Sequence, residues 1–276
     1  MEITGRVAIV TGGASGAGRA IALGLASRGA AGVVVSDVDA DGAEQVAAEI
    51  EKAGARGLAV GTDVSRQEDI NDLVMQCEAA FGPASLFFSN AGIIVVGGPE
   101  AADEAWSKIW AVNVQSHIYV SRAVLPGMLA RGEGYLVITA SAAGLLTQLG
   151  SAPYAVTKHA AVALAEWLSI TYGDRGIRVS CLCPQAFTSN LLSTSVRELG
   201  GAPPLAGASG GSAQAAVDGV LTAEQVAQSA LDAIGTEQFL ILPHPEVATY
   251  ERRRADDRER WLRGMRRMQA RLADQA

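Results

Sequence analysis

The stretch Val7-Ala8-Ile9-Val10-Thr11-Gly12-Gly13-Ala14-Ser15-Gly16-Ala17-Gly18 decides the fold of this 276-residue chain. A short apolar run ends in a glycine turn, and a helical pattern follows over residues 20–25. A helix N-terminus presents unpaired N–H groups and the positive end of a dipole, so glycines there admit a pyrophosphate. The turn therefore predicts dinucleotide binding, with a purely steric use of glycine as the alternative. The predicted binding residues of this turn are Gly12, Ser15, Gly16, Ala17 and Gly18.

Outward from this turn, β-rich apolar runs alternate with helical patterns to residue 245. The predicted strands cover residues 7–10, 32–36, 57–60, 86–89, 135–139, 177–183 and 239–242. Strands that are apolar throughout and separated by helices indicate a parallel sheet covered on both faces. We predict one α/β domain over residues 1–245, with a doubly wound, mainly parallel, seven-stranded sheet of the Rossmann type. Residues 246–276 then form a C-terminal helical extension.

Two segments depart from this alternation. Residues 193–219 are rich in Gly, Ala, Ser and Pro, which is typical of a lid or an excursion from a compact fold. We predict a mobile substrate loop over about residues 189–220. Residues 245–272 carry apolar side chains partly at helical spacing, and we predict one helix that packs on the body or on a neighbouring subunit.

Composition excludes several classes of protein. With 49% hydrophobic and 18% charged residues, the chain has material for a full core and no signature of disorder. No apolar run reaches the roughly 18 residues of a membrane span, and the N-terminus lacks an export signal, so a cytoplasmic protein is predicted. The three cysteines, Cys77, Cys181 and Cys183, fit neither a disulfide framework nor a metal site. Residues 251–276 hold nine Arg, but five acidic residues are interleaved, which disfavours a nucleic-acid partner.

An acidic residue follows the second predicted strand. Asp37 lies nineteen residues beyond Gly18, where a carboxylate can accept hydrogen bonds from an adenosine ribose. A carboxylate would repel a 2′-phosphate, and neither the glycine turn nor Val38 offers a cation to hold one. Asp37 and Val38 therefore favour NAD over NADP, with a turn-forming role of Asp37 as the alternative.

The chain resembles the short-chain dehydrogenases/reductases over about residues 4–245. The resemblance rests on motifs in the family's order, namely Thr11-Gly12 through Gly18, Asp63-Val64, Asn90-Ala91-Gly92, Asn113, Ser141, Tyr154-x-x-x-Lys158, and Pro184 with Thr188. It implies that Asp63 and Val64 border the adenine and that the Asn90 segment supports the sheet beside the cofactor. It also implies that Pro184 and Phe187 line the cofactor site and that Thr188 contacts the carboxamide. The resemblance further implies a homo-oligomer, either a dimer or a tetramer.

Two positions depart from the family's pattern. Ser89 precedes Asn90 where the family often has a second Asn. Gln185 follows Pro184 where the family usually has Gly, so an amide replaces backbone freedom near the nicotinamide. We predict that Gln185 contacts the substrate.

The predicted catalytic residues are Asn113, Ser141, Tyr154 and Lys158. Tyr154 and Lys158 are four apart at the start of a predicted helix, so they share one face. A tyrosine has an unperturbed pKa of about 10, so proton transfer at neutral pH needs a nearby cation that favours the phenolate. Lys158 would supply that field and hold the ribose hydroxyls, while Ser141 and Tyr154 bind the substrate oxygen. By resemblance, Asn113 would hold a water that relays protons.

These residues predict an NAD-dependent oxidoreductase that interconverts a secondary alcohol and a ketone. The alternative is a catalytically silent dinucleotide-binding regulator. The predicted substrate segments, residues 93–96, 145–149 and 187–192, contain no Arg or Lys, which favours an uncharged alicyclic, aromatic or steroid-like alcohol. We predict structural roles for His117, His159 and His244, and core packing for Cys181 and Cys183. The predicted association face carries Ala155, Val162, Ala163 and Trp167.

Overall fold

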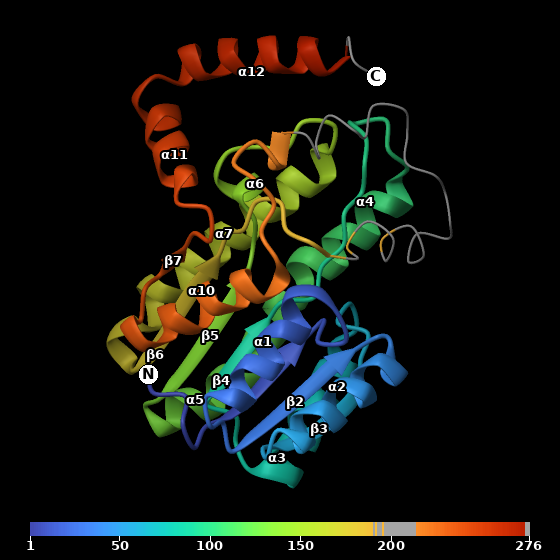
Figure 1. Ribbon diagram of the computed structural model, residues 1–276, viewed down its shortest axis with the longest axis vertical. Coiled ribbons are helices and arrows are strands. Elements are labelled where there is room, and N and C mark those ends of the chain that lie inside the picture. The colour runs from blue at the N-terminus through green and yellow to red at the C-terminus, as the bar shows by residue number, and fades with distance from the viewer. Residues whose placement is uncertain (190, 192–194, 196–213, 274–276) are drawn as a thin grey trace.

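Short runs of β-branched and other apolar residues form a parallel sheet in the computed structural model of the chain (Figure 1). The seven strands are paired in the order β3-β2-β1-β4-β5-β6-β7, and every pair is parallel. Their bounds are β1 (Val7–Thr11), β2 (Gly32–Asp37), β3 (Arg56–Gly61), β4 (Leu86–Ser89), β5 (Gly134–Thr139), β6 (Ile177–Leu182) and β7 (Leu240–Ile241). This confirms the predicted α/β fold of the Rossmann type.

The structure describes residues 1–189, 191, 195 and 214–273. The segment predicted as a mobile substrate loop lies for the most part outside these residues. In the described part of the chain, no helix is long and apolar enough to cross a membrane.

Helices lie on both faces of the sheet (Figure 1). The face that packs against α1, α2 and α10 is opposite the face that packs against α3, α5 and α7. The helix bounds are α1 (Gly16–Ser27), α2 (Ala40–Lys52), α3 (Gln67–Phe81), α4 (Asp103–Trp110), the π-helical turn η1 (Ala111–Gln115), α5 (Ser116–Arg131), α6 (Ala142–Leu145), α7 (Ala152–Tyr172), the 3₁₀ turn η2 (Gly173–Arg175), α10 (Ala223–Thr236), α11 (Glu246–Asp256) and α12 (Arg258–Ala273).

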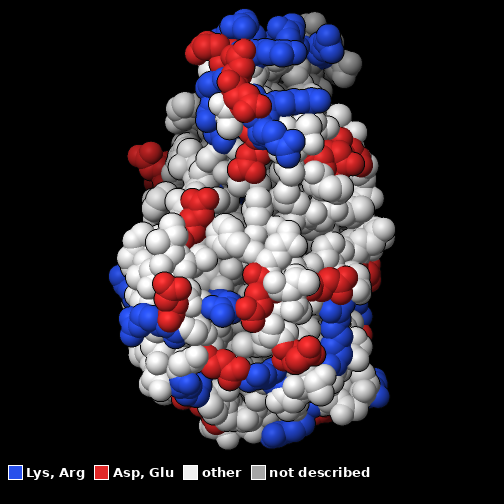
Figure 2. Space-filling view, turned by 90° about the vertical axis from the view of Figure 1, so that its left-hand side faces the viewer, with Lys and Arg blue, Asp and Glu red and all other residues white. Residues whose placement is uncertain are grey.

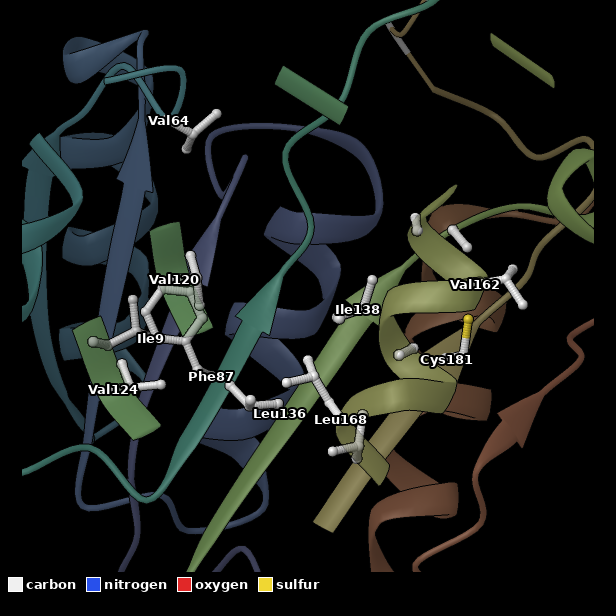
Figure 3. Close-up of a cluster of buried hydrophobic side chains, with 14 of the residues drawn as sticks. Ile9, Val64, Phe87, Val120, Val124, Leu136, Ile138, Val162, Leu168 and Cys181 are labelled. Atoms are coloured by element: carbon white, nitrogen blue, oxygen red, sulfur yellow. The ribbon is translucent and has the colours of Figure 1, made fainter. Parts of the chain in front are cut away.

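Side chains of the strands alternate between two buried clusters, as the pleat requires. Ile9 of β1 and Phe87 of β4 join the cluster under α3, α5 and α7 (Figure 3). Ala8 and Val10, their neighbours on β1, join the cluster under α1, α2 and α10. Both clusters are apolar because both faces of the sheet are covered. This double burial is the reason that the strands are apolar throughout rather than alternating.

The strand order reverses between β1 and β4. After β3 the chain returns past β1 and continues on the other side of the sheet. In open α/β sheets, the crevice beyond the carboxyl ends of the strands at such a reversal is the ordinary ligand site. The glycine turn after β1 and the Asn90 segment after β4 meet at this point, so the topology places the predicted motifs together.

The C-terminal extension consists of two helices rather than the single predicted one. The chain turns between α11 and α12 at Asp257, whose backbone leaves the helical region with φ −146° and ψ 88°. Figure 1 shows α12 lying across one end of the molecule. Charged side chains gather at this end, above a middle region that is largely uncharged in the view of Figure 2.

The predicted association face on α7 is partly wrong. Ala155 and Val162 are only 7% and 8% exposed and pack within the chain's own core. Trp167 and Ile170 are 55% and 84% exposed, and Ala163 is also exposed. Helical spacing alone does not show which side of α7 faces the sheet. Helix α7 packs against β5 and β6, which covers Ala155 and Val162.

Candidate active site

The glycine turn brings two chain segments into close approach. Gly12 has φ +66°, and a Cβ there would lie 2.9 Å from Cα of Ala91. A Cβ on Gly18 would lie 2.0 Å from the carbonyl oxygen of Gly12. Helix α1 begins at Gly16 without a side-chain cap from Ser15 and without an acidic residue in its first turn. Its N-terminus therefore keeps backbone donors and dipole available to an anion.

Asp37 stands at the end of β2 and faces the glycine turn. Its Oδ2 accepts a hydrogen bond from the backbone N–H of Ala14 at 3.0 Å, and its Oδ1 accepts one from Asp39 at 3.0 Å. These bonds fix the carboxylate at the mouth of a cavity that runs over the turn. Val38 beside it is 52% exposed.

This first cavity follows the carboxyl ends of β1, β2, β4 and β5. Every residue predicted to bind the cofactor lines it except Thr188. Thr188 is exposed and donates from its backbone N–H and its hydroxyl to the carbonyl oxygen of Leu221, and its contact with the carboxamide stays a prediction. Lining residues that the motifs did not predict are Ala14, Asp39, Thr62, Ile93, Lys108, Val112, Thr139, Ala140, Ser189 and Leu191.

Asn90 ties three strand ends together on the cavity floor. Its backbone N–H donates to Oγ1 of Thr11 at 3.0 Å, and its Nδ2 donates to the Thr11 carbonyl oxygen at 3.1 Å. Thr139 Oγ1 donates to Asn90 Oδ1 at 3.1 Å. This network supports the sheet beside the cavity, and it uses the second residue of the Ser89-Asn90 pair, so the departure at Ser89 leaves it intact.

Ser141, Tyr154 and Lys158 meet beside this floor. Ser141 follows β5, caps α6 by accepting from the Ala143 N–H at 3.1 Å, and shares a hydrogen bond with Tyr154. Lys158 Nζ donates to the carbonyl oxygen of Thr139 at 2.9 Å and lies 5.6 Å from the centre of the Tyr154 ring. Tyr154 and Lys158 are one turn apart on α7, as their spacing predicts.

The two titratable groups have displaced pKa values. Burial raises the pKa of the Tyr154 phenol, and the hydrogen bond with Ser141 opposes this rise. Burial lowers the pKa of the Lys158 ammonium to about 8. The pKa of Tyr154 is therefore raised in the chain alone, because desolvation of the phenolate outweighs the hydrogen bond with Ser141.

Asn113 lies behind the cavity floor rather than in it. It is fully buried in η1, where its Oδ1 accepts from the Ile93 N–H at 2.9 Å and its Nδ2 donates to the Ile93 carbonyl at 2.8 Å. A Cβ on Gly92 would lie 3.3 Å from Asn113 Oδ1 and 3.4 Å from Lys158 Nζ. Because Gly92 has no side chain, Asn113 Oδ1 and Lys158 Nζ can both lie close to its backbone.

A second cavity of about 600 Å³ opens on the other side of Tyr154. Predicted substrate residues that line it include Ile94, Val96, Leu146, Leu149 and Gln185. Val95 and Leu145 from the same segments are instead buried in the core, and Ile93 is buried beside the first cavity. Thr147 and Gln148 of the predicted segment 145–149 also line the second cavity, as do residues 214–217 and 220 at the end of the predicted substrate loop. The lining side chains that sequence reasoning missed include five from the C-terminal extension: Tyr250, Arg253, Trp261, Met265 and Met268.

Two polar groups of this cavity bear on the substrate. The backbone N–H of Gln185 donates to Nδ1 of His244 at 3.3 Å, and its buried Oε1 has no hydrogen-bond partner among the described residues. Arg253 brings a cation to the cavity wall, although the predicted substrate segments contain none. Arg253 comes from α11 in the C-terminal extension, outside the predicted substrate segments.

His117 has a structural place beneath the site. It is 1% exposed on α5, and its Nδ1 is 2.6 Å from Oγ of Ser89. Burial and the nearby Lys158 ammonium lower its pKa from 6.5 to about 3. His117 is therefore neutral in the folded chain near neutral pH.

Acid is expected to destabilise the chain through His117. Below pH 6.5 the unfolded chain binds a proton at this residue, whereas the folded chain binds it only near pH 3. The free energy of unfolding therefore decreases as pH falls between these values. At pH 5 the decrease is about 2 kcal/mol. Urea unfolding of His117→Gln at pH 7 and pH 5 should show a smaller loss of stability than the parent chain; equal losses would contradict the assignment.

The fold and the site define a Rossmann-type oxidoreductase. A glycine turn at the strand-order reversal and a Ser, Tyr and Lys set between two cavities are its features. Residues 6–199 match a family model described as short chain dehydrogenase. The chain belongs to the short-chain dehydrogenase family, which confirms the resemblance seen in its motifs.

Individual similar proteins also support membership of this family. The chain is 33% identical over 263 residues to a 1-deoxy-11-beta-hydroxypentalenate dehydrogenase of Streptomyces exfoliatus, covering 93% of this chain and 90% of that protein. It is 33% identical over 194 residues to a cyclohexanol dehydrogenase of an Acinetobacter species, covering 70% and 77% of the two chains. A short-chain dehydrogenase/reductase from Burkholderia phymatum, solved in complex with NAD, superimposes with a TM-score of 0.86 at 33% identity, covering 94% of this chain and 96% of that one.

Proposed function

We propose that this protein is an NAD-dependent dehydrogenase that interconverts a secondary alcohol and a ketone, with Tyr154 as the general acid and base. The observation that carries the proposal is the position of Tyr154, which lines both cavities. Lys158 lines only the first cavity and Ser141 only the second. A phenol at the junction can exchange a proton with a substrate in one cavity beside a coenzyme in the other.

The first cavity fits a nicotinamide dinucleotide. The close approach at Gly12 and the uncapped N-terminus of α1 suit a pyrophosphate. Asp37 would accept hydrogen bonds from the adenosine ribose, and Lys158 would donate to the nicotinamide ribose. When bound, the coenzyme supplies a hydride acceptor or donor.

The residues around the junction have separate roles in orienting the substrate and transferring its proton. Ser141 donates to the substrate oxygen and orients it toward Tyr154. Tyr154 removes the hydroxyl proton during oxidation and returns it during reduction. Lys158 is still largely protonated at pH 7 with a pKa of about 8, so its charge favours the phenolate as the proton is transferred. From the family resemblance, Asn113 would hold a water behind Lys158 that passes the proton on.

The fixed carboxylate of Asp37 supports NAD over NADP. A second negative charge from a 2′-phosphate at this place would be repelled. Among the described residues of the first cavity, Lys108 and Lys158 are the cations. Lys108 lies 4.0 Å from the carboxylate of Asp63, and Lys158 lies beside Tyr154.

Asp37→Asn is expected to lower the preference for NAD over NADP. A lost hydrogen bond to a charged group costs about 1.5–3 kcal/mol, which corresponds to roughly 10- to 150-fold in the affinity ratio. Titration calorimetry with both coenzymes measures this ratio. The matched control is Asp39→Asn, because Asp39 lines the same cavity but caps α2, and an equal change in this control would argue against ribose recognition by Asp37.

We propose an alicyclic, aromatic or steroid-like alcohol as the substrate. The largely apolar lining of the second cavity supports this class, as do the names of the relatives, one a dehydrogenase of cyclohexanol and another of a hydroxypentalenate. A panel of such alcohols with NAD⁺ tests the proposal through formation of reduced coenzyme. Turnover restricted to sugar phosphates, or no turnover, would overturn it.

We also propose a cytoplasmic homo-oligomer. Exposed Trp167, Ile170 and Val156 lie on the outer side of α7, and apolar side chains that gather on one face favour association. Sedimentation of the purified chain tests this, and a monomer at micromolar concentration would contradict it.

A further inference from the structure

The outer wall of the second cavity is built by the C-terminal extension. Trp261, Met265 and Met268 of α12 are spaced by four and three residues, so they share one helix face, and all three line the cavity. Arginines such as Arg260 and Arg263 occupy other faces of α12 and are exposed. Helix α12 is thus amphipathic, with its apolar face toward the cavity.

Arg254 fastens the extension to the catalytic elements. Its Nη1 donates to the carbonyl oxygen of Leu145, the last residue of α6, and its Nη2 lies 3.3 Å from Nε2 of His159 on α7. Nδ1 of His159 lies 2.8 Å from the Ala155 carbonyl. A carbonyl only accepts, so Nδ1 carries the proton and Nε2 accepts from Arg254. One guanidinium therefore joins α11 to the helices that carry Ser141 and Tyr154.

The same guanidinium holds the first apolar residue of α12. Its Cζ lies 5.4 Å from the centre of the Trp261 ring, within the range of a cation–π contact. Trp261 also packs against the main hydrophobic cluster. The position of α12 over the cavity is therefore set by α6 and α7, although α12 lies outside the sheet and its covering helices (Figure 1).

We propose that α12 is a specificity-determining wall that selects multi-ring alcohols over single-ring alcohols. The proposal rests on the function proposed above and deepens it. The cavity of about 600 Å³ lies within the range of roughly 300–1,000 Å³ that encloses drug-sized ligands. Ser141 and Tyr154 line the same cavity as Met265 and Met268, so a multi-ring substrate held at Ser141 would extend toward α12, and Met side chains adapt to irregular apolar shapes.

The double variant Met265→Ala/Met268→Ala tests the wall. With NAD⁺ and a 3-hydroxysteroid, KM is expected to rise about 10-fold or more, because each lost apolar contact in a pocket is worth about 10-fold. With cyclohexanol, kcat and KM should stay within about twofold. Leu262→Ala is the matched control, since Leu262 is on the same helix, is 37% exposed and does not line the cavity.

A second pair of variants tests the fastening. Arg254→Met is expected to raise KM for the steroid and leave kcat for cyclohexanol unchanged, because Arg254 positions the wall. Arg252→Met on the same helix should change neither, since Arg252 is exposed and does not line the cavity. Equal effects on the two alcohols, or no effect on either, would overturn the proposal. Melting temperatures of all variants identify any that fail to fold.

Binding without turnover separates this inference from the proposed function. Tryptophan emission of the parent chain with NAD⁺, compared with that of Trp261→Phe, reports titration by a 3-ketosteroid or by cyclohexanone, since a ketone cannot accept a hydride from the oxidised coenzyme. Weaker steroid binding in the Met variant with unchanged cyclohexanone binding supports the wall even if no alcohol is oxidised. Failure of the alcohol panel alone refutes the proposed function, whereas undiminished steroid binding by the Met variant refutes the wall.

Discussion

Replacement of Tyr154 by Phe is expected to lower kcat for alcohol oxidation by about 10²- to 10⁴-fold, the usual contribution of a general acid or base. The change removes one hydroxyl at the junction of the two cavities and keeps the ring that lines them. Affinity for NAD⁺ should change by about twofold or less, because Lys158, Asp37 and the glycine turn remain. Steady-state kinetics with titration of the coenzyme measures both quantities.

Tyr172→Phe provides the control for this variant. Tyr172 is the last residue of the same helix, and its ring packs edge-on against Trp167 with centroids 5.9 Å apart. Its hydroxyl lines neither cavity. Comparable losses in both variants would indicate damage to α7, and full activity of Tyr154→Phe would remove Tyr154 from the mechanism.

Lys158→Met is expected to abolish most turnover and, at pH 7 without coenzyme, to stabilise the chain. Burial lowers the pKa of Lys158 from 10.5 to about 8, so the folded state binds this proton more weakly than the unfolded state. The penalty is absent above pH 10.5, grows as pH falls to about 8 and is constant below that. Met avoids this penalty but leaves the Thr139 carbonyl without its donor, so we expect a net gain of about 2 kcal/mol.

Urea unfolding at pH 7 and pH 10 measures this gain. The difference between Lys158→Met and the parent chain should shrink as pH rises from 8 toward 10.5. Lys52→Met is the control, because Lys52 is exposed at the end of α2. A Lys158→Met chain less stable than the parent at pH 7 would show that the buried ammonium does not destabilise the folded chain.

The sheet and the cofactor side of the site could be predicted from the sequence because their signals are local. Val33, Val34 and Val35 form an apolar run since both faces of β2 are covered. Asp37 is the last residue of β2, and parallel strands bring their carboxyl ends to one edge. The glycine turn, Asp37 and Asn90 therefore meet without any knowledge of long-range packing.

The outer side of the site depends on packing that no local pattern encodes. Thr188 is next to lining residues, yet it is hydrogen-bonded to the Leu221 carbonyl and does not itself line the first cavity. The interleaved charges of residues 251–276 predict a solvated helix for Arg253, whereas apolar residues such as Met265 predict packing on the body or on a neighbouring subunit. Helical spacing shows which residues share a face but not what that face covers. The turn at Asp257 is what brings α12 across the cavity.

Transfer of deuterium tests the central claim most directly. The chain is mixed with NAD⁺ and a secondary alcohol that carries deuterium on its carbinol carbon, and the reduced coenzyme is analysed by mass spectrometry. We predict deuterium in the coenzyme, ketone as the co-product, and neither with Tyr154→Phe over the same period. Ketone formed without deuterium in the coenzyme, or equal transfer by Tyr154→Phe, would contradict a hydride transfer that depends on this phenol.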